Sequence, residues 1–292
     1  MKSNKNFNEY YNFLKTEIHN SKLASIKNTL LELFKLINNP SCSARELKEI
    51  VELDPPLTLR ILKLANSAYY GTFRKLTDIQ EAIVWLGFDT VKHLAMSMKV
   101  IEVFEGDNQH NKFSRLDLWK SSIATAIMGK ALYRREFYDP GSFIYSVGLL
   151  HNIGVILLDQ FRTEDYRNIL DKMYDTNKDL NLCEKEILGF DHTELAADIM
   201  EEWGFPINLI NTIKHHHNPI NAPKSNRKDT YSIFLIDQIL KNEGIGFADN
   251  SLFNQYRYDS SLKFLKLDPV CFEPILELVQ CELNEMHTNG IL

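Results

Sequence analysis

The hydrophobic residues of this chain recur at the spacing of an α-helix along most of its length. In one clear stretch, Leu23, Ile26, Leu30, Leu33 and Ile37 follow one another at intervals of three or four positions, which lays an apolar stripe along one helical face. No stretch of comparable length alternates apolar and polar residues as a half-buried strand does. The pattern therefore predicts an all-α protein built of many short helices.

Helix starts are marked by capping residues. Ser43, Asp78 and Asp191 each stand three positions before a glutamate, an arrangement in which both side chains can bond the first free N–H groups of a helix. Asp268 followed by Pro269 predicts the start of a last helix, which we expect to pack back on the core. Proline and glycine clusters separate the predicted helices at 38–40, 54–56, 139–141, 204–206 and 218–223.

A polar segment at 106–112 divides an N-terminal half of the chain from a half that holds most of the histidines. It is the best candidate for an internal boundary. The predicted organisation is an N-terminal helical extension at 1–22, an N-terminal helical lobe at 23–106, a second helical lobe at 107–245 and a C-terminal helical extension at 246–292.

Composition narrows the classes of partner. With 292 residues and 44% hydrophobic residues, the chain can bury a substantial core. Its 33 Lys and Arg against 39 Asp and Glu give a net charge of -6, which offers no general attraction to phosphate backbones. We therefore expect no nucleic-acid partner and favour a protein or a small molecule.

Cysteines and apolar runs bear on the compartment. Cys42, Cys183, Cys271 and Cys281 lie far apart and form no Cys-x-x-Cys pair, so neither a zinc knot nor a disulfide framework is predicted. We see no apolar run near the roughly 20 residues of a membrane span, and the polar N-terminus lacks the apolar centre of a signal peptide. These observations predict a cytoplasmic protein without a membrane span.

The most informative motif is Gly148–Gly154, which reads Gly-Leu-Leu-His-Asn-Ile-Gly. A His-Asp pair in such a frame can bind a divalent metal, because both groups offer lone pairs and the carboxylate lowers the pKa of metal-bound water. Here Asn152 follows His151, which keeps the shape and loses the charge. That substitution favours recognition over catalysis.

Two separated phrases of the N-terminal half resemble a known family. Asn66-Ser-x-Tyr69 is followed by Ala82-Ile-x-x-Leu-Gly87, and together they resemble the N-terminal half of the HDOD domain, a bacterial signalling relative of the HD phosphohydrolases. The resemblance extends over roughly residues 25–240. It continues through Leu118-Trp119, Gly148–Gly154, Asp191-His192, Trp203–Pro206 and the segment 213–219. It implies an all-α, two-lobed domain that serves as an output or adaptor module in signal transduction.

The resemblance also implies which residues correspond to the HD metal ligands. The first histidine of the HD set falls on Ser121, or on Ser122 if the register slips, and the His-Asp pair becomes His151 and Asn152. Because two of the four primary positions lack a ligand, we expect no catalytic residue and no required cofactor. A degenerate site could still hold zinc, iron or nickel weakly; its candidate ligands are His151, His192, His216, His217 and Asp237.

Structural roles remain open for each of these residues. Asp237 is either a relic ligand or a partly exposed residue of an amphipathic helix, and His151 could pin the helix that starts near Asn152. Adjacent side chains in a helix point in different directions. The run 215–217 therefore predicts that its three histidines cannot all face one ion and that one or two are exposed.

The groove between the two lobes is the candidate binding site for a partner or a ligand. Its predicted residues are Asn66, Tyr69, Tyr70 and Trp85. For the aromatic cluster of Tyr69, Tyr70, Phe73 and Trp85 we favour core packing, whereas exposed members would serve as anchors for a partner.

Three hypotheses for function follow from these observations. The leading one is a non-catalytic bacterial regulatory module that binds a signalling protein or a small regulatory ligand between its lobes. The alternative is a metal-dependent phosphohydrolase acting on a nucleotide or phosphodiester, with Asn152 as a neutral oxygen ligand. A third is a nucleotide sensor that binds without turnover, which the sequence does not separate from the first.

Overall fold

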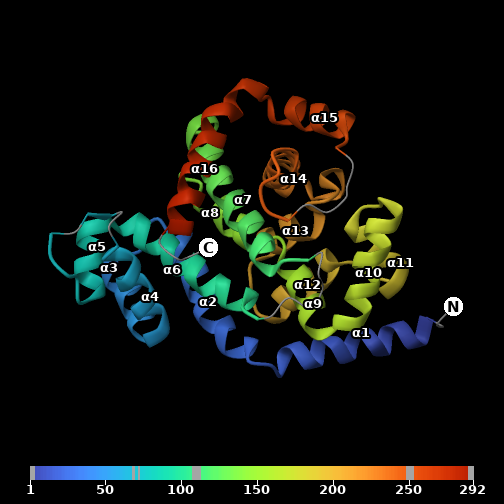
Figure 1. Cartoon of the computed structure of the whole chain (residues 1–292), viewed down its shortest axis with the longest axis horizontal. Helices are drawn as coiled ribbons and strands as arrows, with labels where there is room; N and C mark the ends of the chain where they lie inside the picture. Colours follow the sequence, from blue (N-terminus) through green and yellow to red (C-terminus); the bar gives the residue numbers. More distant parts are fainter. Residues whose placement is uncertain (1–3, 68–69, 72, 107–112, 248–252, 289–292) are drawn as a thin grey trace.

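The computed structural model describes residues 4–67, 70–71, 73–106, 113–247 and 253–288. Within these residues the chain is helical and contains no strand, so the predicted all-α, two-lobed fold is confirmed (Figure 1). The N-terminal lobe comprises α2 (Leu23–Ile37), α3 (Ala44–Glu52), α4 (Pro55–Ala65), α5 (Ile79–Leu86) and α6 (Phe88–Phe104). The predicted boundary at 106–112 lies almost wholly outside the described residues.

The second lobe is larger and holds the histidine-rich half of the chain. It comprises α7 (Arg115–Glu136), α8 (Ser142–Leu150), α9 (Ile153–Phe161), α10 (Thr163–Thr176), α11 (Leu180–Leu188), α12 (His192–Glu202), α13 (Ile207–His215) and α14 (Arg227–Asn242). Short 3-10 turns at Pro219–Asn221 and Lys224–Asn226 join α13 to α14.

Helices at both ends of the chain cover the second lobe. The first is α1 (Asn4–His19), which runs beneath α9 and α10 in Figure 1. The last two are α15 (Gln255–Leu265) and α16 (Glu273–Thr288), separated by the 3-10 turn Pro269–Phe272. As predicted, Asp268 caps that turn and α16 packs back on the core, against α7.

The apolar stripe predicted from the sequence forms the buried face of α2. Leu30 and Leu33 are fully buried, and Leu23, Ile26 and Ile37 are at most 9% exposed. This face packs against α6, and burying each such side chain contributes about 1.5–3 kcal/mol to folding. The helical period therefore predicted not only the helix but also the face that it buries.

The predicted caps are present. Ser43 and Asp191 each accept a hydrogen bond from the N–H of the glutamate three residues on, whose carboxylate returns to the capping N–H. Asp78 likewise accepts from the N–H of Glu81, but the Glu81 carboxylate bonds the N–H of Thr77, one residue further out. Two complete capping boxes and one half box thus fix the starts of α3, α12 and α5.

Asn66, predicted as a groove residue, has a structural role at the end of α4. Its amide nitrogen donates to the carbonyl oxygens of Leu62 and Leu76 at 2.8 and 2.9 Å, and its amide oxygen accepts from the N–H of Leu76 at 2.7 Å. The side chain therefore ties the end of the helix to a segment ten residues further on.

Replacing this amide is expected to destabilise the N-terminal lobe. Asn66→Ala removes three hydrogen bonds and leaves the N–H of Leu76 without its partner, so we expect the free energy of unfolding to fall by about 2–3 kcal/mol. Urea titration followed by circular dichroism measures this change. Asn12→Ala, an exposed asparagine in α1, is the matched control and should stay within about 0.5 kcal/mol of the parent. An equally small change at Asn66 would contradict the structural role.

The first helix is tied to the second lobe by polar contacts. The hydroxyl of Tyr11 donates to Asp198 at 3.0 Å, and Glu17 pairs with Arg162 at 2.7 Å. Tyr10 also donates to Asp165 on α10. The N-terminal extension is therefore bound to the lobe that carries the histidines.

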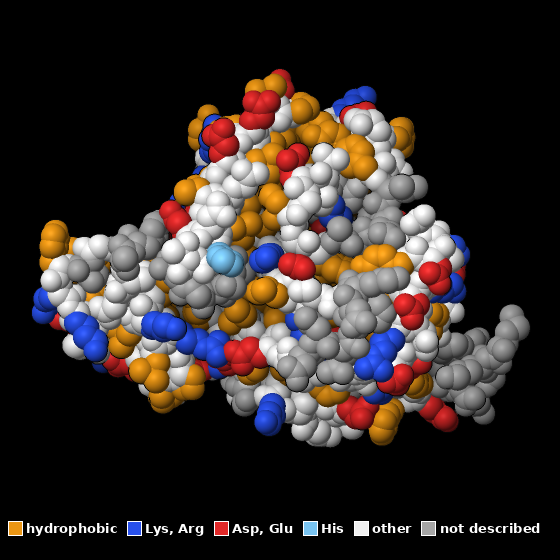
Figure 2. Space-filling model, viewed as in Figure 1, with side chains coloured by type: hydrophobic (Ala, Val, Ile, Leu, Met, Phe, Trp, Pro, Cys, Tyr) orange, Lys and Arg blue, Asp and Glu red, His pale blue; other side chains and the backbone are white. Residues whose placement is uncertain are grey.

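Two of the three described members of the aromatic cluster do not pack in the core as favoured from the sequence. Phe73 is 96% exposed and Trp85 is 44% exposed, and their rings meet edge to face at 6.0 Å between centroids. The Trp85 indole donates to the carbonyl oxygen of Tyr70, which is half-buried, and Tyr69 lies outside the described residues. Figure 2 shows hydrophobic side chains at this outer end of the N-terminal lobe, beside α5.

One stretch of the described residues is long and apolar enough to cross a membrane, contrary to our expectation from the sequence. It is Ser142–Phe161, and 89% of its apolar window is buried inside the protein. The stretch consists of α8, a turn at His151 and Asn152, and α9. Its apolar character is that of a core segment.

Candidate functional site

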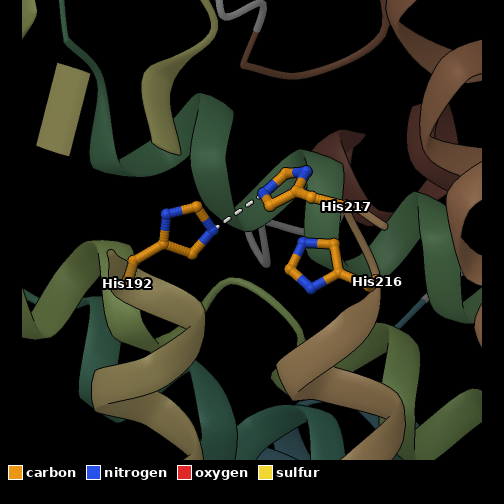
Figure 3. A group of neighbouring side chains, drawn as sticks. All are labelled: His192, His216 and His217. Atoms are coloured by element: carbon orange, nitrogen blue, oxygen red, sulfur yellow. Dashed lines mark hydrogen bonds between the residues drawn. The ribbon is translucent and has the colours of Figure 1, made fainter. Parts of the chain in front are cut away.

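Three histidines from the ends of two helices meet inside the second lobe. His192 is the first residue of α12, and His216 and His217 follow directly on the end of α13. One ring nitrogen of each can be chosen so that all three lie within 4.8 Å of one another (Figure 3). We call His192, His216 and His217 the histidine trio.

His216 and His217 converge although they are neighbours in the chain. The prediction that one or two of the histidines at 215–217 are exposed is wrong, because all three are buried or half-buried. Because α13 ends at His215, the chain turns at His216 and His217 instead of continuing the helix. Their ring centroids lie only 4.0 Å apart, and His216 is 1% exposed. His215, still helical, is the member of the run that lies apart from the trio.

A buried glutamate orients His192. Glu184 of α11 accepts from the His192 backbone N–H at 2.9 Å and contacts the His192 Nδ1 atom at 2.7 Å. Because a carboxylate only accepts, Nδ1 carries the proton and Nε2 is left to face the trio. Burial raises the pKa of Glu184, while its bonds to His192 oppose that rise. Sequence reasoning missed Glu184, since nothing in its local pattern distinguishes it.

Hydrogen bonding within the trio satisfies two of its nitrogens. His217 Nε2 lies 3.0 Å from His192 Nε2 (Figure 3), and because the latter bears no proton, His217 is the donor. Burial, with His216 and His192 nearby, holds the pKa of His217 well below its ordinary value. A metal ion bound between these two atoms would require His217 to move its proton from Nε2 to Nδ1.

His151 and His216 share one arrangement. Each is essentially buried and donates its Nδ1 proton to a carbonyl oxygen three residues earlier, that of Gly148 or Ile213, at 2.7 Å. Neither Nε2 atom has a hydrogen-bonding partner in the described part of the chain. Burial lowers the pKa of both imidazoles to about 3. As anticipated, His151 is a buried, hydrogen-bonded residue directly before α9.

These bare nitrogens meet the chemical requirement of a metal ligand. A neutral imidazole whose Nδ1 proton bonds a carbonyl oxygen or a carboxylate presents Nε2 in the orientation that metals use. His192 and His216 both fit this description, and three imidazoles suit zinc, iron or nickel. The ring centroid of His151 lies 5.3 Å from that of His216, so His151 adjoins the trio without belonging to it.

The carboxylate predicted as a further ligand is engaged elsewhere. Asp237 is 7% exposed, which excludes the alternative of a partly exposed residue, and it pairs with Lys241 at 2.8 Å. The positive charge of Lys241 contributes to lowering the pKa values of His151 and His216. Asn152 is half-buried and stands at the N-cap of α9 without bonding the helix through its side chain.

Ser121, which stands where the HD set has its first histidine, contacts the segment that leads to the C-terminal helices. The Ser121 hydroxyl accepts from the N–H of Phe247 at 2.7 Å, and a side chain at Gly246 would collide with Ser121. Ser122 is fully buried beside it. A serine at this position therefore has a packing role that a histidine would not fill.

A separate pocket of about 340 Å³ lies between the two lobes and α16. Of the described residues predicted for the groove, Tyr70 lines this pocket, whereas Asn66 and Trp85 do not. Sequence reasoning missed its polar lining, above all His93 and Lys130, because these residues come from helices far apart in the chain.

The fold and the family agree with the resemblance seen in the sequence. The sequence model of the HDOD domain matches residues 23–219, and the chain therefore belongs to the HDOD domain family. An uncharacterized protein of Treponema pallidum is 26% identical over 252 residues, which cover 84% of this chain and 46% of that protein. The chain thus spans about half the length of this relative.

Solved structures share the fold over most of the chain. An HDOD domain protein of unknown function from Geobacter sulfurreducens is 19% identical with a TM-score of 0.73, covering 89% of this chain and 90% of that one. A protein named as a candidate phosphohydrolase from Shewanella amazonensis is 25% identical with a TM-score of 0.65, covering 90% of each chain. A protein from Marinobacter aquaeolei, named as a candidate signal transduction protein, is 24% identical with a TM-score of 0.75, covering 90% and 58%.

Proposed function

We propose that this chain is a cytoplasmic bacterial regulatory module that acts by binding a signalling protein or a small regulatory ligand, without catalysing hydrolysis. The observation that carries the proposal is the hydrogen bonding of the histidine trio and of the carboxylates near it. Its own hydrogen bond joins His217 to His192, and the nearby carboxylates of Glu184 and Asp237 are bonded to His192 and Lys241. Of the described carboxylates, these two are therefore already engaged and neither is a free direct ligand for a divalent ion at the trio.

Charge supports the same proposal. A phosphohydrolase centre gains from carboxylate ligands, which hold the metal and balance its charge. Here Asn152 replaces the carboxylate of the His-Asp pair, and Lys241 places a cation where it disfavours a second positive charge. A chain that keeps the fold but lacks these carboxylate ligands is better suited to binding a partner or ligand than to hydrolysis.

A metal-dependent phosphohydrolase is the second candidate, and the trio itself favours it. Three neutral imidazoles can bind zinc and lower the pKa of its bound water. A small polar hollow of about 40 Å³ adjoins the trio, and its lining includes the cations Lys241 and Arg257 beside the carboxylate of Asp179. In that case the three histidines would hold the ion and the two cations would orient a phosphate ester.

Metal content and hydrolysis together test the proposal. We expect untagged protein purified without chelator to hydrolyse neither a nucleoside triphosphate nor bis(p-nitrophenyl) phosphate in the presence of added zinc, iron or nickel. Elemental analysis of the parent and of a His192→Ala, His216→Ala double variant measures the metal held by the trio. His215→Ala, whose side chain lies apart from the trio, is the matched control.

Turnover that requires metal and disappears in the double variant, but not in His215→Ala, would overturn the regulatory proposal. Circular dichroism must show that the double variant is folded. If it is not, His217→Gln is the replacement, since it removes an imidazole that makes no bond to a buried carboxylate.

A further inference from the structure

The pocket between the lobes is formed where three parts of the chain meet. The N-terminal lobe contributes residues of α4 and α6, the second lobe contributes residues of α7 and α8, and α16 closes the third side. In Figure 1, α16 descends along α7 and α8 and ends beside α6. A molecule bound here would therefore contact all three parts at once.

His93 lines this pocket with a buried imidazole whose Nε2 is enclosed by the protein. The residue is 5% exposed, and its Nδ1 lies 2.6 Å from the carbonyl oxygen of Asp89, so Nδ1 carries the proton. Nε2 has no partner among the described residues. Burial and the charge of Lys130 lower the pKa of His93 to about 3, which keeps the imidazole neutral.

Lys130 contributes a positive charge to the lining of the pocket. Its Nζ lies 3.1 Å from His93 Nδ1, but that atom is already protonated and cannot accept a hydrogen bond. Burial and Arg134 lower the pKa of Lys130 to about 8. In the described ranges Lys130 has no carboxylate within ion-pair distance, although both Glu282 and Asp89 attract it from further away.

Glu282 supplies the complementary anion from α16. Burial raises the pKa of its carboxyl group, and Lys130 attracts it without forming an ion pair in the part of the chain that the structure describes. The two opposite charges therefore face the same pocket without neutralising each other directly. The rest of the wall is largely apolar, with Leu64, Leu94, Ile127, Leu278 and Met286.

The geometry points to this pocket as the binding site of a zwitterionic small molecule of the amino-acid class with an apolar side chain. The ligand carboxylate pairs with Lys130, its ammonium pairs with Glu282, and its side chain packs on the apolar wall. The inference rests on the proposed regulatory function and gives the chemical class of the ligand. A volume of about 340 Å³ lies within the range of small-molecule sites.

Other classes of ligand fit this lining less well. A nucleotide or another polyanion would place phosphates near Glu282 and Glu285, which both line the pocket. A purely apolar molecule would leave Lys130 and Glu282 desolvated without partners. Only a molecule with one group of each sign satisfies both charges, and the net charge of Lys130, Arg134, Glu282 and Glu285 together matches a neutral zwitterion.

Isothermal titration calorimetry with L-leucine, L-methionine and L-phenylalanine tests the inference on the full chain. We expect saturable binding of at least one of the three. The corresponding molecules with a single charge, such as 4-methylpentanoate and 3-methylbutylamine for leucine, should bind at least about tenfold more weakly, because each leaves one buried charge unpaired. Glu282→Gln should raise the Kd by at least about tenfold and Lys130→Met should do the same.

Glu277→Gln is the matched control, since Glu277 lies on α16, is exposed and does not line the pocket; its Kd should equal that of the parent. Should Lys130→Met fail to fold, Glu282→Gln alone decides. Failure of all three amino acids to bind, equal binding of the single-charge molecules, or an unchanged Kd in Glu282→Gln would each overturn the inference. None of these results concerns hydrolysis at the histidine trio, so the regulatory proposal is judged separately by its own assay.

Discussion

Lowering the pH from 7 to 5 is expected to reduce the free energy of unfolding of the metal-free protein by about 6 kcal/mol, at about 2 kcal/mol for each of three buried histidines. The three are His93, His151 and His216, whose pKa values burial lowers to about 3, and His217, whose pKa is also held well below its ordinary value, adds to the loss in the same direction. Most domains have only about 5–15 kcal/mol of stability in total. Mild acid should therefore bring this protein close to unfolding.

The direction of the effect follows from comparing the pH at which these histidines take up a proton in the folded and in the unfolded chain. In the folded chain these imidazoles stay neutral down to about pH 3, whereas in the unfolded chain they take up a proton near their ordinary pKa of about 6.5. Between these two values the unfolded state binds more protons. Stability is therefore complete above about pH 6.5 and is lost progressively as the pH falls towards 3.

Urea unfolding at pH 7, 6 and 5 in the presence of a chelator measures this dependence. His151→Leu should reduce the loss between pH 7 and 5 by about 2 kcal/mol, since it removes one of the buried histidines that titrate only on unfolding. His287→Asn replaces an exposed histidine and should leave the slope unchanged. A free energy of unfolding that is flat between pH 7 and 5 would show that these imidazoles do not remain neutral in the folded protein.

Local pattern was sufficient to predict the helices because each signal acts within one turn. The stripe from Leu23 to Ile37 and the caps at Ser43 and Asp191 depend on residues three or four positions apart, and the structure places them as predicted. At Asn66 the side chain bonds both locally, to the carbonyl oxygen of Leu62, and over a longer distance in the chain. What could not be predicted is the distant target of its amide, the backbone of Leu76.

The sequence named the three histidines of the trio among five candidate ligands, but it did not predict which of the five come together or how they are connected. His192, His216 and His217 do come together, but the sequence did not reveal that α13 ends at His215 and so lets two neighbours converge. Nor did it reveal that Glu184 fixes the proton of His192. Such partners are set by helix packing, which brings together residues with no regular spacing in the chain.

The lining of the inter-lobe pocket could not be predicted from the sequence either. The aromatic cluster drew attention to the right junction, yet Phe73 and Trp85 lie on the outer surface and only Tyr70 among the described predictions lines the pocket. His93 and Lys130 carry its polarity, and they sit 37 positions apart on different helices. Local sequence patterns contain no information on which polar residues of two distant helices share a cavity.

Gly154→Ala is expected to destabilise the protein by more than about 4 kcal/mol, although alanine is the better helix former by about 1 kcal/mol. A Cβ atom at Gly154 would lie 1.9 Å from the carbonyl oxygen of His192 and 2.7 Å from its carbonyl carbon. Both are backbone atoms at the start of α12, so no side chain can rotate away. The two helices would have to separate.

Thermal and urea unfolding of Gly154→Ala measure this cost, with Gly244→Ala as the matched control. Gly244 has a positive φ of 66°, but a Cβ there meets nothing within 4 Å, so only backbone strain of about 1 kcal/mol is expected. A Gly154→Ala variant within 1 kcal/mol of the parent would contradict the close approach of α9 to α12. Because Gly154 follows His151 by three residues and lies against the backbone of His192, this close approach fixes the helix after the His151 turn against the start of α12.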